Sequence, residues 1–93
     1  MLISNSTGEQ VKVRSGDSFS IVFDEDTMNF LKSPNINIKI VVKTSSSYYT
    51  VSDNKFDIIN GKTFVYGGSY SGMVYLQIDL IVYNDFEVDY ILN

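Results

Sequence analysis

Residues 73–83 read MVYLQIDLIVY, and every second position from Val74 to Val82 is apolar. A period of two is the spacing of side chains along one face of a β-strand, so this stretch predicts a strand with one buried face. A polar pair, Asn84-Asp85, comes next, and residues 86–92, FEVDYIL, then alternate again. We therefore predict that the sequence closes with a long antiparallel hairpin.

The hydrophobic pattern also predicts the loop of this hairpin. A two-residue loop at Asn84-Asp85 would bring Glu87 and Asp89 onto the apolar face. A three-residue loop at 83–85 makes every inward pair apolar: Val82 with Phe86, Leu80 with Val88, Ile78 with Tyr90 and Leu76 with Leu92. Because a slip of one residue turns every side chain to the other face, we predict the longer loop, with Asn84 or Asp85 at positive φ.

The other face of residues 73–83 is half apolar, which is more than a solvated strand needs. Cover by the chain's own loops would explain this face, and tyrosines half-buried in a sheet would explain its rings. Tyrosine among serine, glycine and asparagine is also typical of recognition surfaces, because the ring supplies contact area at a low entropy cost. On that reading the candidate interaction surface consists of Tyr66, Tyr70, Met73, Tyr75, Ile81 and Tyr83.

The first half of the chain predicts a hairpin, a helical turn and a strand. Residues 10–14 and 19–23 both alternate around Ser15-Gly16-Asp17, which favours a first hairpin. Residues 25–32 could form one short helical turn before Pro34. Residues 36–42 place isoleucine and valine on one face and predict a half-buried strand.

The second half predicts further short strands. Residues 48–51 form one, and residues 56–59 and 62–66 flank Asn60-Gly61, a pair preferred in type I′ hairpin turns. Residues 67–72 contain three glycines and predict a flexible loop. About seven or eight closely spaced strands predict an all-β fold. We expect one antiparallel β-sandwich domain over residues 1–93, Ig-like or jelly-roll-like.

Composition argues against most catalytic chemistry. The sequence has no cysteine, which removes disulfides and thiolate metal sites, and no histidine, which excludes a Ser-His-Asp triad. Asp24-Glu25-Asp26 could offer oxygen atoms to calcium, but the spacing of an EF-hand loop is absent and an acidic surface turn is favoured. Glu87 and Asp89 are better explained as a solubilising strand edge than as a catalytic pair. We predict no enzyme activity and no cofactor.

The net charge of −4 repels phosphate backbones, so a nucleic-acid partner is not expected. No stretch resembles a secretory signal or a membrane span, so we expect no membrane partner, and the sequence does not fix the cellular location.

Residues 11–23, VKVRSGDSFSIVF, resemble the opening hairpin of small β-sandwich modules in bacteriophage virions. Those modules include the N-terminal domain of baseplate upper proteins, head-fibre proteins and decoration proteins. Residues 60–64, NGKTF, and 72–80, GMVYLQIDL, are similar to the second half of such modules. The resemblance implies a non-catalytic, oligomeric virion protein whose sheet edges and tyrosine-rich face bind neighbouring subunits.

Two functions therefore remain in view. The first is a structural or adaptor module of a phage-like virion, acting through protein–protein contacts and forming homo-oligomers. The alternative is a ligand-binding module, for example for carbohydrate, that uses Tyr66, Tyr70 and Tyr75 around the 67–72 loop.

Overall fold

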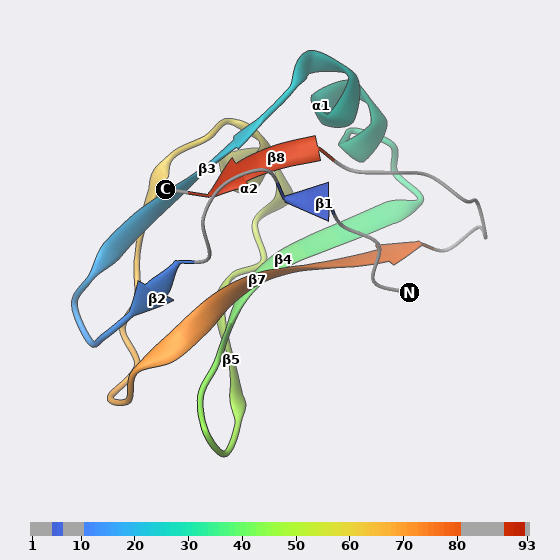
Figure 1. Ribbon diagram of the computed structural model, residues 1–93. Coiled ribbons are helices and arrows are strands. Elements are labelled where there is room, and N and C mark those ends of the chain that lie inside the picture. Colours follow the sequence, from blue (N-terminus) through green and yellow to red (C-terminus); the bar gives the residue numbers. More distant parts are fainter. Residues whose placement is uncertain (1–4, 7–10, 81–88, 93) are drawn as a thin grey trace.

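Two packed β-sheets make up the computed structural model, which describes residues 5–6, 11–80 and 89–92 (Figure 1). The first sheet has the strand order β1-β8-β3-β6 and the second the order β2-β7-β4-β5. The strands are β1 (Asn5–Ser6), β2 (Lys12–Val13), β3 (Ser18–Phe23), β4 (Ile36–Lys43), β5 (Tyr48–Ser52), β6 (Thr63–Val65), β7 (Gly72–Leu80) and β8 (Asp89–Leu92). Among these ranges only β1 and β8 pair in parallel. The predicted all-β sandwich is confirmed.

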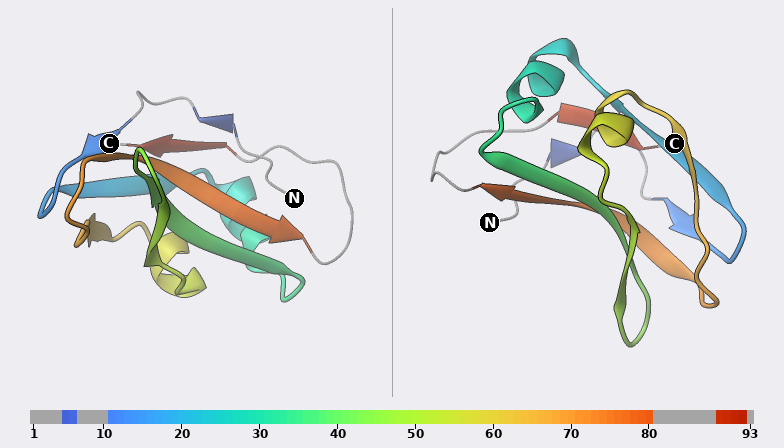
Figure 2. Two further views of the ribbon diagram at one scale, coloured as in Figure 1. Left: turned by 90° about the horizontal axis from the view of Figure 1, so that it is seen from below. Right: turned by 180° about the vertical axis from the view of Figure 1, so that it is seen from behind.

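Two short helices join strands of the sandwich (Figure 2). Helix α1 (Glu25–Leu31) follows β3 and confirms the helical turn predicted near residues 25–32. Helix α2 (Lys55–Ile59) lies in the connection from β5 to β6 and contacts β3 of one sheet and β4 of the other. It buries Ile58 and Ile59, so it fills part of the space between the sheets.

The inward faces of both sheets form one hydrophobic core. On β4, the predicted apolar face is buried from Ile36 to Val42. From the facing sheet, Phe19 stacks on Phe64 with ring centroids 5.8 Å apart. Burial of this kind is the main favourable contribution to folding in a chain without disulfides.

The predicted closing hairpin is wrong in its pairing. Strand β7 pairs with β2 and β4, whereas β8 pairs with β1 and β3, so the two strands lie in different sheets. The observed pairs are Leu76 with Ile40, Ile78 with Ile38, Leu80 with Ile36, Tyr90 with Phe23 and Leu92 with Ile21. The faces were predicted correctly, because alternate residues of β7 are buried. The predicted 83–85 loop and the pair of Val82 with Phe86 lie outside the described residues.

The predicted first hairpin is also wrong. Strand β2 pairs with β7, while β3 pairs with β6 and β8, so the Arg14–Asp17 turn crosses between sheets. The Asp17 N–H donates to the Arg14 carbonyl at 2.9 Å, and Gly16 adopts φ +88°. A tight turn with alternating flanks is common to hairpins and to such crossovers, since both strands bury alternate residues in the same core.

The strand predicted at residues 56–59 is part of α2. The Asn54 side chain accepts from the Asp57 N–H at 3.1 Å, which begins the helix, and Gly61 at φ +69° follows its end. Asn60 has φ −77°, whereas a type I′ turn needs positive φ at both central residues. An Asn-Gly pair also suits a helix C-terminus, where only the glycine is left-handed. The strand predicted at 62–66 is confirmed as β6.

Candidate functional site

Two surfaces of the sandwich collect exposed aromatic side chains. The first lies on the second sheet, on the side away from the core. Strand register places Lys43 between Met73 and Tyr48, and in the next row places Val41 between Tyr75 and Thr50. We call this surface the outer face and define it by Val41, Lys43, Tyr48, Met73 and Tyr75.

The outer face is hollowed rather than flat. Val41, Lys43, Tyr48 and Tyr75 line a cavity of about 400 Å³. Val41 is only 6% exposed although it points away from the core, while Tyr48 is 67% exposed. The Lys43 ammonium lies 5.7 Å from the centroid of the Tyr48 ring, within the range of a cation–π contact. This surface therefore combines apolar area with positive charge.

The outer face ends at a sheet edge. Strand β5 is the last strand in the order β2-β7-β4-β5, so within the described residues it has one paired side. Natural edge strands are usually protected by charged residues or proline, and β5 reads YYTVS, with neither. Its one irregularity is a register shift opposite Ile40 and Val41, next to Val51. A bulge of this kind twists an edge and limits how far it can pair.

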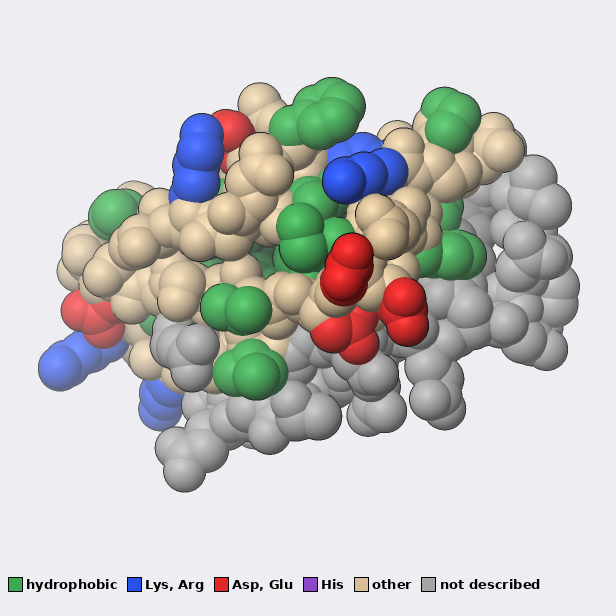
Figure 3. Space-filling view, turned by 90° about the horizontal axis from the view of Figure 1, so that it is seen from above, with side chains coloured by type: hydrophobic (Ala, Val, Ile, Leu, Met, Phe, Trp, Pro, Cys, Tyr) green, Lys and Arg blue, Asp and Glu red, His purple; other side chains and the backbone are tan. Residues whose placement is uncertain are grey.

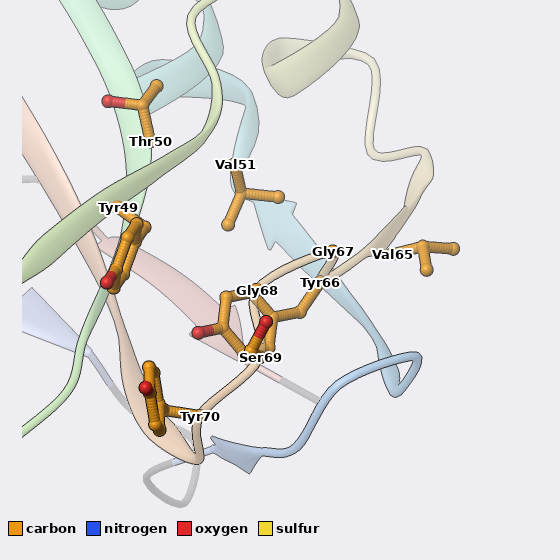
Figure 4. Close-up of a pocket in the computed structure, with 9 residues that line it drawn as sticks. All are labelled: Tyr49, Thr50, Val51, Val65, Tyr66, Gly67, Gly68, Ser69 and Tyr70. Atoms are coloured by element: carbon orange, nitrogen blue, oxygen red, sulfur yellow. The ribbon is translucent and has the colours of Figure 1, made fainter.

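The second surface is a pocket between β5 of one sheet and β6 of the other (Figure 4). Its volume is about 550 Å³, within the range of small-molecule sites. We call it the edge pocket; its lining consists of Tyr49, Thr50, Val51, Val65, Tyr66, Gly67, Gly68, Ser69 and Tyr70. Tyr49 reaches it because Tyr49 is opposite Val42 and shares the inward face, whereas Tyr48 points outward. No lining side chain is charged.

Tyr66 forms the floor of the edge pocket. It is 1% exposed, and its hydroxyl has no hydrogen-bond partner among the described residues. Its backbone is fixed, because its N–H donates to the Asp17 carbonyl at 2.9 Å and its carbonyl accepts from the Gly16 N–H at 2.8 Å. Gly68 lies so close to the ring that a side chain at position 68 would overlap the Tyr66 hydroxyl. The loop after β6 is therefore folded directly over this phenol.

The structure divides the predicted interaction surface in two. Tyr66 and Tyr70 belong to the edge pocket, Met73 and Tyr75 belong to the outer face, and Ile81 and Tyr83 lie outside the described residues. Tyr75 thus does not line the edge pocket with Tyr66 and Tyr70, whereas the carbohydrate alternative placed all three around the 67–72 loop. The composition of the sequence also pointed to Tyr48 and Tyr49 as recognition tyrosines, but the candidate surface left them out, together with Val41 and Lys43. Alternation along residues 48–51 would have assigned the two adjacent tyrosines to opposite faces.

The acidic turn before α1 has a structural role. Asp24 is the N-cap of the helix, and its carboxylate accepts from the Thr27 N–H at 2.7 Å. Hydrogen bonding to Thr27 lowers the pKa of Asp24 below its ordinary value. Figure 3 shows acidic side chains gathered on this side of the molecule. In the part of the chain that is described, no group of three or more histidine, cysteine, aspartate or glutamate residues could hold a metal ion.

Lys55 is a second polar anchor. Its ammonium donates to the carbonyl of Ser33 and, at 2.8 Å, to that of Ile36, so α2 holds the connection between α1 and β4. Burial lowers the pKa of Lys55 from its ordinary value.

Comparisons with protein-family models, with curated proteins and with solved structures found no match to this chain. Within the described ranges, neither helix has the length and apolar character needed to cross a membrane.

Proposed function

We propose that this protein is a non-enzymatic structural or adaptor module of a phage-like particle, and that it assembles through the outer face and the β5 edge. The observation that carries the proposal is the pair of exposed tyrosines on the outer face, Tyr48 and Tyr75, next to an edge strand without charge. Tyrosine and methionine are enriched in the cores of protein interfaces. An open sheet edge offers backbone hydrogen bonds to another strand.

A second copy of the chain is the partner that this surface fits best. Lys43 and Asp79 lie at opposite ends of the paired strands β4 and β7, and both line the cavity of the outer face. A two-fold axis that sets the strands of two copies antiparallel would bring Lys43 of each copy towards Asp79 of the other. Such self-complementarity is what an isologous dimer requires. The link to a virion is supported by the sequence resemblance of residues 11–23, 60–64 and 72–80.

Sedimentation velocity over a series of protein concentrations tests the proposal. We expect the wild-type protein to associate reversibly, and Tyr75→Ser to shift it towards monomer because it removes one of the two aromatic rings of the outer face. Thr50→Lys, which adds charge to the β5 edge, should act in the same direction. Val22→Ser is the matched control, because Val22 is 49% exposed but belongs to the other sheet.

Two results would contradict the proposal. One is a wild-type protein that stays monomeric at every concentration. The other is a Tyr75→Ser variant that associates like the wild type while circular dichroism shows the same fold.

A further inference from the structure

The Tyr66 hydroxyl is buried without a hydrogen-bond partner among the described residues, and Tyr66 is one of the residues that line the edge pocket. Buried hydroxyl groups are nearly always satisfied, because the loss of water is otherwise uncompensated. An unsatisfied buried group in a native protein calls for an explanation, such as local strain, a catalytic role or a bound water, ion or ligand. In this protein the unpartnered group is on a residue whose backbone is held by two hydrogen bonds to the Gly16–Asp17 turn.

The rest of the edge pocket defines the chemistry of a ligand. Its lining provides hydroxyl groups, from Ser69 as well as the tyrosines, and aromatic rings, but no charged side chain. A phosphate or carboxylate would lose its hydration there without gaining an ionic partner. Tyr70 is 64% exposed and Tyr49 is 39% exposed, so both rings present area to a ligand. In Figure 4 they stand on the side of the pocket towards which the Tyr66 side chain extends.

We infer that the edge pocket binds a neutral saccharide, with the Tyr49 and Tyr70 rings packed against its C–H faces and the Tyr66 hydroxyl bonded to one of its hydroxyl groups. Saccharides combine these two requirements: they carry many neutral donors and acceptors, and their C–H groups are attracted to the electron-rich face of an aromatic ring. A phenol can donate and accept at once, which matches a sugar hydroxyl. The inference does not rest on the proposed self-association. The two surfaces share strand β5, whose Tyr49 lines the edge pocket, but the saccharide contacts do not include the outer face.

Access to the phenol requires Gly68 to move. The glycine packs directly on the Tyr66 ring, whereas its neighbour Gly67 has open space where a side chain would be. Two successive glycines leave the backbone freer to rotate than any other pair of residues. The inference therefore requires the backbone at Gly67 and Gly68 to shift away from Tyr66, so that the ligand can supply the hydrogen bond to its hydroxyl.

Isothermal titration with maltotriose, cellotriose and chitotriose tests the inference, with amide resonances of the pocket followed by NMR. At least one of these neutral trisaccharides should bind saturably and shift the resonances of Thr50 and Ser69. Tyr66→Phe should weaken that binding about tenfold, the value of one hydrogen bond. The same variant should melt at the same temperature as the wild type or higher, because it removes an unpartnered hydroxyl.

The controls separate the edge pocket from the outer face. Tyr70→Ala should also weaken binding, whereas Tyr75→Ala should leave the affinity unchanged. The inference is overturned if none of the three trisaccharides binds, if Tyr66→Phe binds as tightly as the wild type, or if Tyr75→Ala abolishes binding. Self-association is measured without sugar, so its failure and the failure of saccharide binding are distinguishable.

Discussion

Replacing Gly72 with alanine tests how closely β7 approaches β4. A methyl group at position 72 would lie 2.5 Å from Val42 Cγ1 and 2.6 Å from the carbonyl oxygen of Lys43. Favourable contacts between carbon atoms lie at about 3.5–4.0 Å, so at least one neighbour would have to retreat by about 1 Å. Gly72 is the first residue of β7 and is opposite Val13 of β2, so the methyl group would be held between neighbouring strands.

The size of the effect follows from what the methyl group meets. Val42 is fully buried, and the Lys43 carbonyl belongs to β4, which is paired on both sides, so neither can move freely. Overpacking of this kind costs about 1–3 kcal/mol, and a backbone neighbour places Gly72→Ala in the upper part of that range. For a domain of 93 residues, a loss of about 2 kcal/mol lowers the melting temperature by roughly 8–16 °C.

Thermal and urea unfolding, followed by circular dichroism, measure this loss against a matched substitution. Gly67→Ala introduces the same methyl group at a position with no atom within 4 Å and without positive φ. It should be neutral or stabilise the protein by up to about 1 kcal/mol, because alanine restricts the unfolded chain. Equal stabilities for the two variants would refute the close approach of β7 to β4.

Three further substitutions test the caps and the core. Asp24→Ala should destabilise the protein at neutral pH. Hydrogen bonds to Thr27 lower the pKa of Asp24 in the folded protein. The stability that the Asp24 carboxylate contributes is therefore present above its unfolded-state pKa and is lost as the pH falls through its folded-state pKa. Urea midpoints against pH should then converge for the variant and the wild type in acid. Lys55→Met should destabilise the protein by about 1–3 kcal/mol, because it leaves the carbonyl oxygens of Ser33 and Ile36 without their donor. Lys62→Met is the control: it breaks the 2.7 Å surface ion pair with Asp57 and should cost less than about 1 kcal/mol. Ile78→Ala, at a fully buried position, should cost about 2–5 kcal/mol in the same urea assay.

The period of two predicted which side chains of β7 are buried, because successive side chains of any strand point to opposite faces of its sheet. Val74 and Ile78 are buried as predicted, and Tyr75 between them is 39% exposed. The same reasoning failed for strand partners. In a sandwich both sheets turn an apolar face to one core. Ile78 would therefore be buried equally well opposite Tyr90 or opposite Ile38. Nothing local to β7 distinguishes a hairpin partner from a strand nearly forty residues earlier in the sequence.

Helix α2 was the second source of error, for a related reason. Ile58 and Ile59 are adjacent, which gives neither a period of two nor a full helical period, and Asn60-Gly61 then suited two different structures. The decisive signal was the N-cap: Asn54 comes three residues before Asp57, and its side-chain oxygen accepts a hydrogen bond from the Asp57 N–H. A five-residue helix offers little besides its caps, so a search for periodicity misses it.

The candidate site was predictable in its residue type but not in its geometry. Tyrosines at the side of a small sandwich have an ordinary use, because the ring can cover the core while the hydroxyl stays in water. Tyr49 and Tyr70 fit that use, since both are well exposed at the side where β5 and β6 meet. Their presence alone is therefore weak evidence for a ligand. Tyr66 differs from them, because its hydroxyl is buried away from solvent and has no hydrogen-bond partner among the described residues. If covering the core were its only role, phenylalanine would serve better at position 66, and the stability of Tyr66→Phe relative to its saccharide affinity distinguishes these two explanations.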